Sequence, residues 1–553
     1  MKFVKLLFVA ALVSGTAAAQ TAVKEAPPKN WHLLDPSTGH NGISLDKAYS
    51  ALKATGLKSN RVVVAVIDSG IDTLHEDLKP VLWKNPGEIP HNGIDDDKNG
   101  YVDDVHGWNF IGGKDGRNVK EDTYEAARVY YNLKSKWEGR DIDASSLSGK
   151  EKEEYETYLR AKEAVAGGVN MEEVAFMKQL LPKFLRGDSV IRKELGKEEY
   201  NANDLEKYAS ENQDARNTRM LIMNISKANN SNEITNTQLI DDINGQLRKA
   251  EAADKPPVPY RKDIVGDDET DINDRFYGNN DLMASTPFHG THVAGIIAAA
   301  RNNNKGIDGV ADNVAIMVLR AVPDGDEHDK DIALAIRYAV DNGAKIISMS
   351  FGKDFSPEKH WVDDAFRYAE SKGVLLVHAA GNSAKNIDST HNYPNPVYVD
   401  GSGRASNVIT VGAAGDMKNG GLTASFSNYG KSEVDVFAPG VGIYSTIPGG
   451  TTYGNASGTS MAAPVVSGVA ALIMQYYPNL SAQQVKYAIE KSAVAPKVKV
   501  KKPGTDEEVD LSELSKTGGF LNAHEAVKIA GTLKPEKKKE VLPKTQIKKN
   551  TKG

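Results

Sequence analysis

Two regions of the chain, 58–118 and 262–530, share the same pattern of hydrophobic and polar positions. In both, short continuous runs of β-branched residues, such as 62–67, are followed by longer amphipathic or small-residue stretches. Continuous apolar runs of this length are typical of strands buried on both faces of a parallel sheet, and the longer stretches are typical of helices. The pattern therefore predicts an α/β fold with a three-layer, doubly wound and mostly parallel sheet. The predicted strands are 62–67, 314–322, 345–350, 374–380 and 408–412, and the predicted helices between them include 331–342 and 362–372.

Residues 119–261, between these two regions, have a different pattern. Strand-like runs become rare, and apolar residues recur at helical spacing among charged ones. Those from Met171 to Leu181 fall on one helical face, which is expected to end before Pro182. We expect roughly three to six helices here, forming an α-helical subdomain inserted into the α/β domain. The sequence leaves its role open between a lid, a partner-binding module and a stabilising element.

Residues 1–19 are expected to be a secretory signal peptide. Lys2 and Lys5 precede an apolar run over 6–13, and the small residues 17–19 provide a cleavage site. The apolar run is too short for a membrane anchor, because a spanning helix needs about 20 apolar residues. We therefore expect an exported protein, periplasmic, secreted or held at the cell surface, with no membrane span.

Two further segments flank the α/β domain. Residues 20–57 are polar and are predicted to contain one short helix over 43–49. Residues 531–553 are rich in Lys, Pro and Glu, a composition typical of a disordered basic tail.

Composition and charge narrow the classes of partner. The chain of 553 residues has a formal net charge of −6 and no cysteine. So small a charge for this length does not indicate nucleic acid as a partner. Because no disulfide can form, an exported protein of this kind has to gain its stability from a large core or a bound metal.

The acidic stretch 95–104 is the candidate site for such a metal. Carboxylate and carboxamide side chains alternate here before Gly100, as oxygen ligands do in a calcium loop. So many neighbouring carboxylates repel one another unless a cation neutralises them. His106 departs from the pattern, because a complete EF-hand loop would place a glutamate there, and the alternative is an acidic turn in solvent. The candidate ligands of a structural Ca²⁺ are Asp95, Asp97, Asn99, the carbonyl of Tyr101, and Asp103 or Asp104.

Ser460 lies at the predicted N-terminal end of a buried helix. The small, apolar run 465–474 follows it, and Pro464 is expected in the first turn, where its missing N–H costs least. The free N–H groups and the positive dipole end at such a position can hold a developing oxyanion. The alternative is a plain N-cap serine.

Two other side chains complete a candidate proton relay. Asp68 follows the strand 62–67, at the carboxyl end where parallel sheets bind ligands, and His289 precedes another small-residue helix. A serine hydroxyl becomes a good nucleophile when an imidazole removes its proton and a carboxylate orients that imidazole. Asn382, beyond the strand 374–380, can donate an N–H to the oxyanion.

Four blocks of the sequence resemble the signature blocks of the subtilisin-like serine proteases, or subtilases. They are 68–70 (DSG), 289–295 (HGTHVAG), 379–382 (AAGN) and 458–464 (GTSMAAP), with Asp, His and Ser in the family's order. The resemblance extends over most of the chain outside the insertion. It implies an exported serine endopeptidase that cleaves proteins or peptides through an acyl-enzyme. It also implies that Asp68 orients the base, His289 is the general base and then acid, Ser460 attacks, Asn382 stabilises the oxyanion, and His292 is structural rather than half of a metal pair with His289.

The resemblance further implies where a substrate binds. The segment 348–352 would pair its backbone with an extended peptide, and 379–381 would help to line the pocket for the residue before the scissile bond. The acidic loop 324–329 would lie on the other side of the peptide. A mild preference for basic residues upstream of the cut is the hypothesis, and a merely solvated loop is the alternative. The candidate substrate-binding residues are Ser348, Ser350, Phe351, Gly352, Ala379, Ala380 and Gly381.

The chain departs from the family pattern in two respects. Asp68 and His289 are 221 positions apart because of the helical insertion, and the N-terminal segment is short for a propeptide that assists folding. An α/β-hydrolase esterase is an alternative class, but it would have a Gly-x-Ser-x-Gly motif, and Ala462 stands where its second glycine would be. A non-catalytic binding relative would lack one of the three groups. A serine-directed probe distinguishes an activated Ser460, which should react, from a binding module, which should not.

Overall fold

The structure of this chain is a computed structural model. It describes residues 27–167, 171–197, 200–228, 234–284, 287–417 and 421–536. The predicted signal peptide and most of the predicted basic tail lie outside the described residues.

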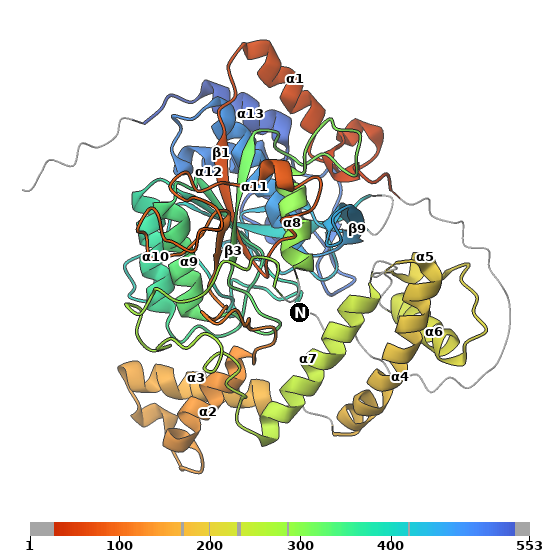
Figure 1. Cartoon of the computed structure of the whole chain (residues 1–553), viewed down its shortest axis with the longest axis vertical. Coiled ribbons are helices and arrows are strands. Elements are labelled where there is room, and N and C mark those ends of the chain that lie inside the picture. The colour runs from red at the N-terminus through yellow and green to blue at the C-terminus, as the bar shows by residue number, and fades with distance from the viewer. Residues whose placement is uncertain are drawn as a thin grey trace, which may run out of the picture.

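A seven-stranded sheet forms the centre of the α/β domain (Figure 1). The strand order is β2-β3-β1-β4-β5-β6-β7, and every neighbouring pair is parallel. β1 pairs with β3 on one side and β4 on the other, so the strand order reverses at β1, which is where open α/β sheets bind ligands. The strands are β1 Val62–Asp68, β2 Gly107–Asn109, β3 Val314–Arg320, β4 Ile346–Met349, β5 Leu375–Ala379, β6 Val408–Ala414 and β7 Val436–Pro439.

Helices cover both faces of this sheet and complete the three layers. One face packs against α1, α8, α11, α12 and α13, and the other packs against α9 and α10. Strand residues are buried on both faces, which explains why their sequence is continuously apolar. The predicted fold class is confirmed. The helices are α1 Leu45–Thr55, α8 Phe288–Ala298, α9 Asp329–Asp341, α10 Lys359–Ser371, α11 Thr459–Tyr476, α12 Ala482–Ser492 and α13 Ala523–Thr532.

The hydrophobic pattern does not predict the shortest elements. β2 and β7 have three and four residues, too few to show a period. Two small antiparallel pairs lie outside the main sheet. They are β8 Ile443–Ile447 with β9 Thr452–Ala456, and β10 Val500–Lys501 with β11 Glu508–Val509.

α11 is the central helix of its layer. It is the one helix of the described residues that is long and apolar enough to cross a membrane, yet 94% of that stretch is buried inside the protein. Pro464 is the sixth residue of α11, so its predicted place in the first turn is wrong. Because proline has no N–H, the carbonyl of Ser460, four residues earlier, has no donor within the helix.

The insertion consists of helices in two lobes. The inner lobe contains α2, α3 and the C-terminal part of α7, which pack around Tyr130 and Phe355; the outer lobe contains α4, α5, α6 and the N-terminal part of α7, which pack around Phe184. In Figure 1 the inner lobe lies below the α/β domain and the outer lobe lies to the right. The helices are α2 Glu125–Trp137, α3 Gly149–Ala166, α4 Met171–Leu195, α5 Ala202–Leu205, α6 Gln213–Ala228 and α7 Asn236–Asp254.

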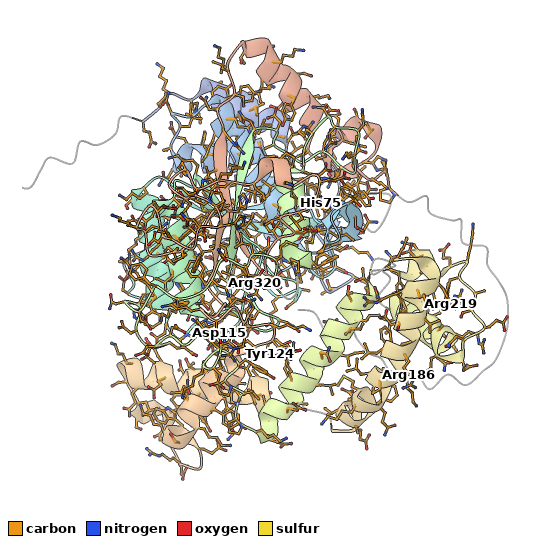
Figure 2. The ribbon with its side chains drawn as sticks, in the orientation of Figure 1. His75, Asp115, Tyr124, Arg186, Arg219 and Arg320 are labelled. Carbon is orange, nitrogen blue, oxygen red and sulfur yellow. The ribbon has the colours of Figure 1, made fainter. Side chains whose placement is uncertain are left out.

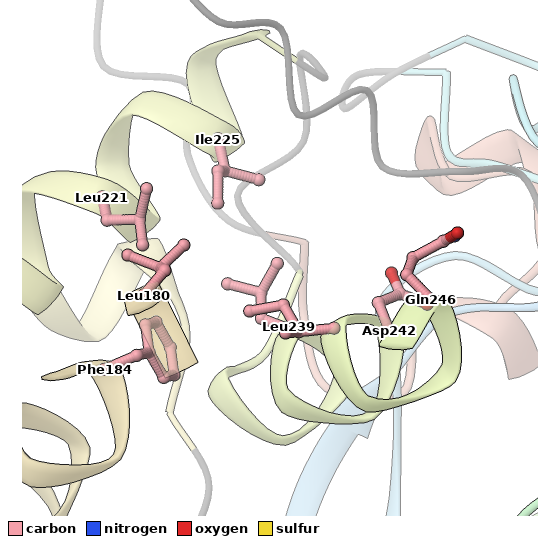
Figure 3. Close-up of a pocket in the computed structure, with 8 residues that line it drawn as sticks. Leu180, Phe184, Leu221, Ile225, Leu239, Asp242 and Gln246 are labelled. Atoms are coloured by element: carbon pink, nitrogen blue, oxygen red, sulfur yellow. The ribbon is translucent and has the colours of Figure 1, made fainter. Parts of the chain in front are cut away.

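α4 continues through Pro182 to Leu195, so the predicted helix end before this proline is wrong. The turns after the proline bury Phe184 and Ile191 in the outer lobe, which offsets the one lost helical hydrogen bond. Three helices of this lobe also surround a small, mostly apolar pocket (Figure 3). Its lining residues are Leu180, Phe184, Leu221, Ile225, Leu239, Asp242, Ile243 and Gln246.

Candidate active site

Asp68 and His289 form a hydrogen-bonded pair at the carboxyl end of the sheet. Asp68 ends β1 and is only 2% exposed, and its Oδ1 lies 2.8 Å from Nδ1 of His289 in the first turn of α8. Gly290 allows the start of α8 to lie this close to the end of β1, because a Cβ at this position would lie 2.2 Å from the carbonyl oxygen of Gly70. An ionised carboxylate only accepts, so His289 donates from Nδ1 and keeps Nε2 free as a base.

The electrostatics of this pair suit a general base. Burial of the imidazole opposes its protonation, but the charge of Asp68 and the hydrogen bond outweigh burial and raise the pKa of His289 above its usual value. The His289 side chain is 39% exposed, so a substrate can reach it from solvent. Asp68 also accepts a hydrogen bond from the backbone N–H of Ser69, at 2.7 Å.

Arg320 supports this pair, although no sequence motif singles it out. It ends β3 opposite Asp68 in the parallel register and is almost wholly buried (labelled in Figure 2). Its guanidinium donates to the carbonyl oxygens of Ser69 (3.2 Å) and Val119 (2.6 Å) and to Oδ1 of Asn109 (3.0 Å). Burial lowers the pKa of Arg320 to about 10, so it stays charged at neutral pH. Arg320 thus ties the turn after Asp68 to the segment that leads into the insertion.

Ser460 lies in the first turn of α11, at the carboxyl ends of β4 and β5. Its Oγ donates to the carbonyl oxygen of Ser350, at 3.1 Å, and Oγ of Ser350 donates to the carbonyl oxygen of Ser460, also at 3.1 Å. α8 and α11 pack side by side, and β1 and β4 are neighbours in the sheet. Ser460 and His289 therefore stand at adjacent strand ends, each in the first turn of its helix.

Asn382 follows β5 and is held against the start of α11. Its Oδ1 accepts from both the N–H and the hydroxyl of Thr459, each at 2.9 Å. These two bonds orient the carboxamide so that Nδ2 is left as a donor beside Gly458, where a Cβ would lie 3.4 Å from it. Together with the backbone N–H of Ser460, Nδ2 can stabilise an oxyanion.

Three predicted substrate-binding residues are buried. Ser348 is 0% exposed, pairs within the sheet on both sides and shares a hydrogen bond with Ser467 of α11. The methyl groups of Ala379 and Ala380 lie in hydrophobic clusters. A buried residue can still line a pocket through its backbone or Cβ, so the assignment of these three residues to substrate binding stays a prediction. Of the other candidates, Ser350 is buried beside Ser460, and Phe351, Gly352 and Gly381 reach the surface.

Asn392 lies between the two segments that the resemblance assigns to the pocket, and the sequence does not single it out. Its Oδ1 is 3.8 Å from the position of a Cβ on Gly352 and 3.5 Å from that of a Cβ on Gly381. His378 stands nearby and its Nε2 donates to the carbonyl oxygen of Phe351, at 2.8 Å. Burial lowers the pKa of His378 to about 4, so this imidazole is neutral.

The acidic loop 324–329 presents little free negative charge to a peptide. Asp324 pairs with Arg248 of α7 at 2.8 Å, and Asp329 pairs with Lys353 at 2.9 Å. Burial raises the pKa of Glu327 to about 8, so its carboxyl is mostly neutral at pH 7. This pairing removes the physical basis of the predicted preference for basic residues.

In the stretch 95–104, the structure brings two of the predicted metal ligands together with a residue that the sequence does not indicate. One carboxylate oxygen from each of Glu88, Asp95 and Asp97 lies within 4.8 Å of the others. Glu88 is buried; its Oε1 accepts from the N–H groups of Asp96 and Asp97, whereas its Oε2 has no partner among the described residues. A buried, unpartnered carboxylate oxygen beside two others fits a hard cation.

The other predicted ligands make hydrogen bonds around this cluster. Asp104 is fully buried, and Asn85, Asn99 and Tyr338 donate to its carboxylate. Asp103 faces away from the cluster and accepts from the N–H groups of Asn92 and Gly93. Tyr101 packs its ring in the core, and its N–H donates to Oδ1 of Asn99. The sequence gives no signal for Glu88 because it lies seven positions before the acidic run, and only the chain's turn brings it back.

The sheet carries an Asp–His pair at its switch point and a serine at an adjacent helix start, which is the arrangement expected of a serine hydrolase. The model of the subtilase family matches residues 59–518, and this chain belongs to that family, the subtilisin-like serine-type endopeptidases. A thermophilic serine proteinase of Bacillus sp. (strain AK1) is 45% identical over 206 residues, which are 37% of this chain and 46% of that protein. Subtilisin DY of Bacillus licheniformis is 40% identical over 209 residues, 37% of this chain and 70% of that protein. A solved structure described as proteases from Pseudoalteromonas arctica is 30% identical, with 46% of this chain and 74% of that one covered and a TM-score of 0.36.

Proposed function

We propose that this protein is a serine endopeptidase whose triad is Asp68, His289 and Ser460. The observation that carries the proposal is the 2.8 Å bond between Asp68 and Nδ1 of His289, which leaves Nε2 as a free base at the strand end next to Ser460. A carboxylate in this position holds the tautomer and stabilises the imidazolium that forms.

The chemistry follows from these positions. Ser460 Oγ turns from the carbonyl of Ser350 to His289, gives up its proton and attacks the peptide carbonyl carbon. The resulting oxyanion accepts hydrogen bonds from Nδ2 of Asn382 and the N–H of Ser460. His289 then protonates the leaving amine, the acyl group remains on Ser460, and a water molecule deprotonated by His289 releases it.

A fluorophosphonate probe tests the proposal directly. The wild type should be labelled at one serine and should cleave a denatured protein, and Ser460→Ala should lose both properties. The matched control is Ser389→Ala, which removes an exposed hydroxyl on a loop and should change neither. Labelling that persists in Ser460→Ala, or a folded wild type that is not labelled at all, would contradict the assignment.

The oxyanion role of Asn382 is testable by the same assays. Asn382→Ala should lower kcat with little change in KM, by about 10²–10³-fold, the size measured for the corresponding donor in subtilisin. Because Oδ1 also accepts from Thr459, Asn382→Asp keeps that contact, replaces the donor with an acceptor and adds a negative charge that repels the oxyanion. A loss confined to Asn382→Ala would assign Asn382 to holding α11 rather than to the oxyanion.

We further propose a structural Ca²⁺ held by Glu88, Asp95 and Asp97, with other oxygens of the stretch 95–104 completing its shell. The unpartnered Oε2 of Glu88 supports a cation there. When bound, the ion would neutralise the three carboxylates and fix a loop that is bonded to α9 through Asp104 and Tyr338.

The export of the protein and its division into domains are further proposals. We propose that residues 1–19 are removed on export, that 58–118 and 262–530 form the catalytic domain around the insertion 119–261, and that substrates are proteins or peptides rather than nucleic acid. The mature N-terminus, read by mass spectrometry of the purified protein, tests the first point.

A further inference from the structure

Two loops follow the strands on either side of the proposed catalytic groups. The β3 wall, residues 321–329, follows β3, and the β4 wall, residues 350–356, follows β4 and begins with the partner of Ser460. If the proposed function holds, a peptide lies between these two walls. The inner lobe of the insertion contacts both of them.

Lys353 is the point at which the two walls meet. Only 2% of its side chain is exposed, although it carries a charge. From the β4 wall its Nζ reaches the carbonyl oxygen of Glu327 (2.7 Å) and Oδ1 of Asp329 (2.9 Å) in the β3 wall. The third partner of Nζ comes from the insertion: Oε2 of Glu125, at 2.8 Å.

Glu125, the first residue of α2, binds the walls in two ways. Its carboxylate, 6% exposed, pairs with Lys353 and with Arg128 one turn along the helix. Its backbone N–H donates to Oδ2 of Asp326 in the β3 wall, at 2.8 Å. Arg128 adds a bond from Nη2 to the carbonyl oxygen of Asp326, at 3.1 Å. The start of α2 is therefore bonded to both walls through buried charges.

An apolar contact runs beside these ion pairs. Phe355 of the β4 wall is buried in the hydrophobic cluster of the inner lobe, and the guanidinium of Arg160 in α3 lies 4.7 Å from its ring centroid. Separating the lobe from the walls would expose this ring and break the buried Glu125–Lys353 pair, which leaves Glu125 with Arg128 and Lys353 with Asp329 as their remaining counter-charges and is unfavourable. The contact is that of a fixed support rather than of a lid that opens.

We propose that the inner lobe is a built-in part of the substrate groove, in which the Glu125–Lys353 pair sets the spacing of the two walls for the upstream residues of a peptide. Glu125 and Lys353 are then positioning residues: they touch neither the scissile bond nor the triad, and they act through the walls. A peptide that extends between the walls depends on their spacing, whereas a substrate that reaches only the pocket next to Ser460 does not.

The inference rests on the proposed function, and the experiment separates the two. Full-length enzyme and its Glu125→Gln, Lys353→Met and double variants are first titrated with a fluorophosphonate, and only the labelled fraction is counted as enzyme. Absence of labelling in the wild type overturns the proposed function before the walls are tested. Each variant is then assayed with an N-acylated tetrapeptide p-nitroanilide and with a single-residue p-nitrophenyl ester that has the same residue next to the scissile bond.

We expect Glu125→Gln to lower kcat/KM on the tetrapeptide by about tenfold or more and to change kcat/KM on the ester less than twofold, because small misplacements of a binding wall are costly only to substrates that use it. On the tetrapeptide, the double variant should lose little more kcat/KM than Lys353→Met alone, because each of the two changes breaks the same ion pair. Glu156→Gln, which removes an exposed, lysine-paired carboxylate of α3, is the control and should change kcat/KM on neither substrate. Equal losses on both substrates, or none on the tetrapeptide, would overturn the proposal, and thermal melts of each variant show whether a loss comes from unfolding.

Discussion

Ser350 and Ser460 exchange two hydrogen bonds, each side chain donating to the other's backbone carbonyl at 3.1 Å. The carbonyl of Ser460 needs this external donor because Pro464 has no N–H to offer it within α11. The exchange fixes the start of α11 to the end of β4, and it places the Oγ of Ser460 in a rest position from which the hydroxyl turns to His289.

Removing the hydroxyl of Ser350 should therefore destabilise the fold. Ser350→Ala leaves the carbonyl of Ser460 without a donor, and we expect a loss of about 1–2 kcal/mol in the free energy of unfolding, measured by chemical denaturation. Pro464→Ala supplies the missing N–H, so the double variant Ser350→Ala/Pro464→Ala should lose less than the sum of the two single changes. Strict additivity would argue against the compensation. Ser226→Ala, a buried serine whose Oγ has no partner among the described residues, is the control and should be close to neutral.

The pH dependence of activity should report on His289. Its raised pKa means that the base becomes neutral, and kcat/KM rises, at a higher pH than for an imidazole without the Asp68 carboxylate. In Asp68→Asn the attraction is lost and burial remains, so the acid limb should shift to lower pH while kcat falls by about 10⁴-fold, as for a serine protease that loses this carboxylate. The same pair stabilises the fold while His289 is protonated, and this contribution is present at acid pH and lost as the pH rises through the raised pKa. An acid limb at the same pH in both enzymes would contradict this account.

Glu327 should make the folded protein less stable as the pH rises. Its pKa of about 8 in the folded state lies above the usual value of 4.5, so the folded chain holds one proton more than the unfolded chain between these values. Glu327→Gln mimics the protonated carboxyl and has no such penalty. The free energy of unfolding of Glu327→Gln should exceed that of the wild type by an amount that grows by about 1.4 kcal/mol per pH unit between pH 5 and 8. Near pH 4 the two proteins should be equally stable. Glu153→Gln, an exposed carboxylate of α3, should show no such slope.

Removal of calcium should lower the melting temperature. At a free Ca²⁺ concentration about 100 times the dissociation constant, binding adds about 2.7 kcal/mol to the free energy of unfolding. Glu88→Gln should weaken the ion's binding in a calcium titration followed by calorimetry, whereas Asp103→Asn, whose carboxylate faces Asn92 and Gly93, should weaken it far less. A chelator that leaves the wild-type melting temperature unchanged would rule out this ion.

The size of residue accepted next to the scissile bond should depend on Asn392. Its carboxamide fills space between Gly352 and Gly381, so Asn392→Gly should deepen the pocket. We compare two peptides that differ only in having an aromatic residue or alanine next to the scissile bond. The ratio of their kcat/KM values should rise about tenfold in favour of the aromatic peptide, which is the effect of burying one or two methylene groups. Thr390→Gly, at an exposed position on the same loop, is a control for added flexibility. An unchanged ratio in Asn392→Gly would show that another side chain closes the pocket.

Much of the fold could be predicted from the chain because its strands are buried on both faces. Continuous apolar runs such as 62–67 have no other stable place than the inside of a parallel sheet, and the small residues around Ser460 and His289 only suit helices packed closely on it. Asp68, His289, Ser460 and Asn382 were within reach of sequence reasoning because each stands where one of these elements begins or ends. Local patterns, taken in their order along the chain, therefore indicated the chemistry of the proposed triad.

Contacts between distant segments were decided by the tertiary structure alone. Glu88 joins Asp95 and Asp97 only because the chain turns back, and Ser348 is buried only because both its strand neighbours and α11 cover it. Likewise, the charges of the acidic loop look free until Arg248, 76 positions away, folds onto Asp324. A sequence specifies which side chains can ionise, coordinate or attack. Whether a given charge meets water, a counter-ion or a substrate depends on which surfaces the fold brings into contact.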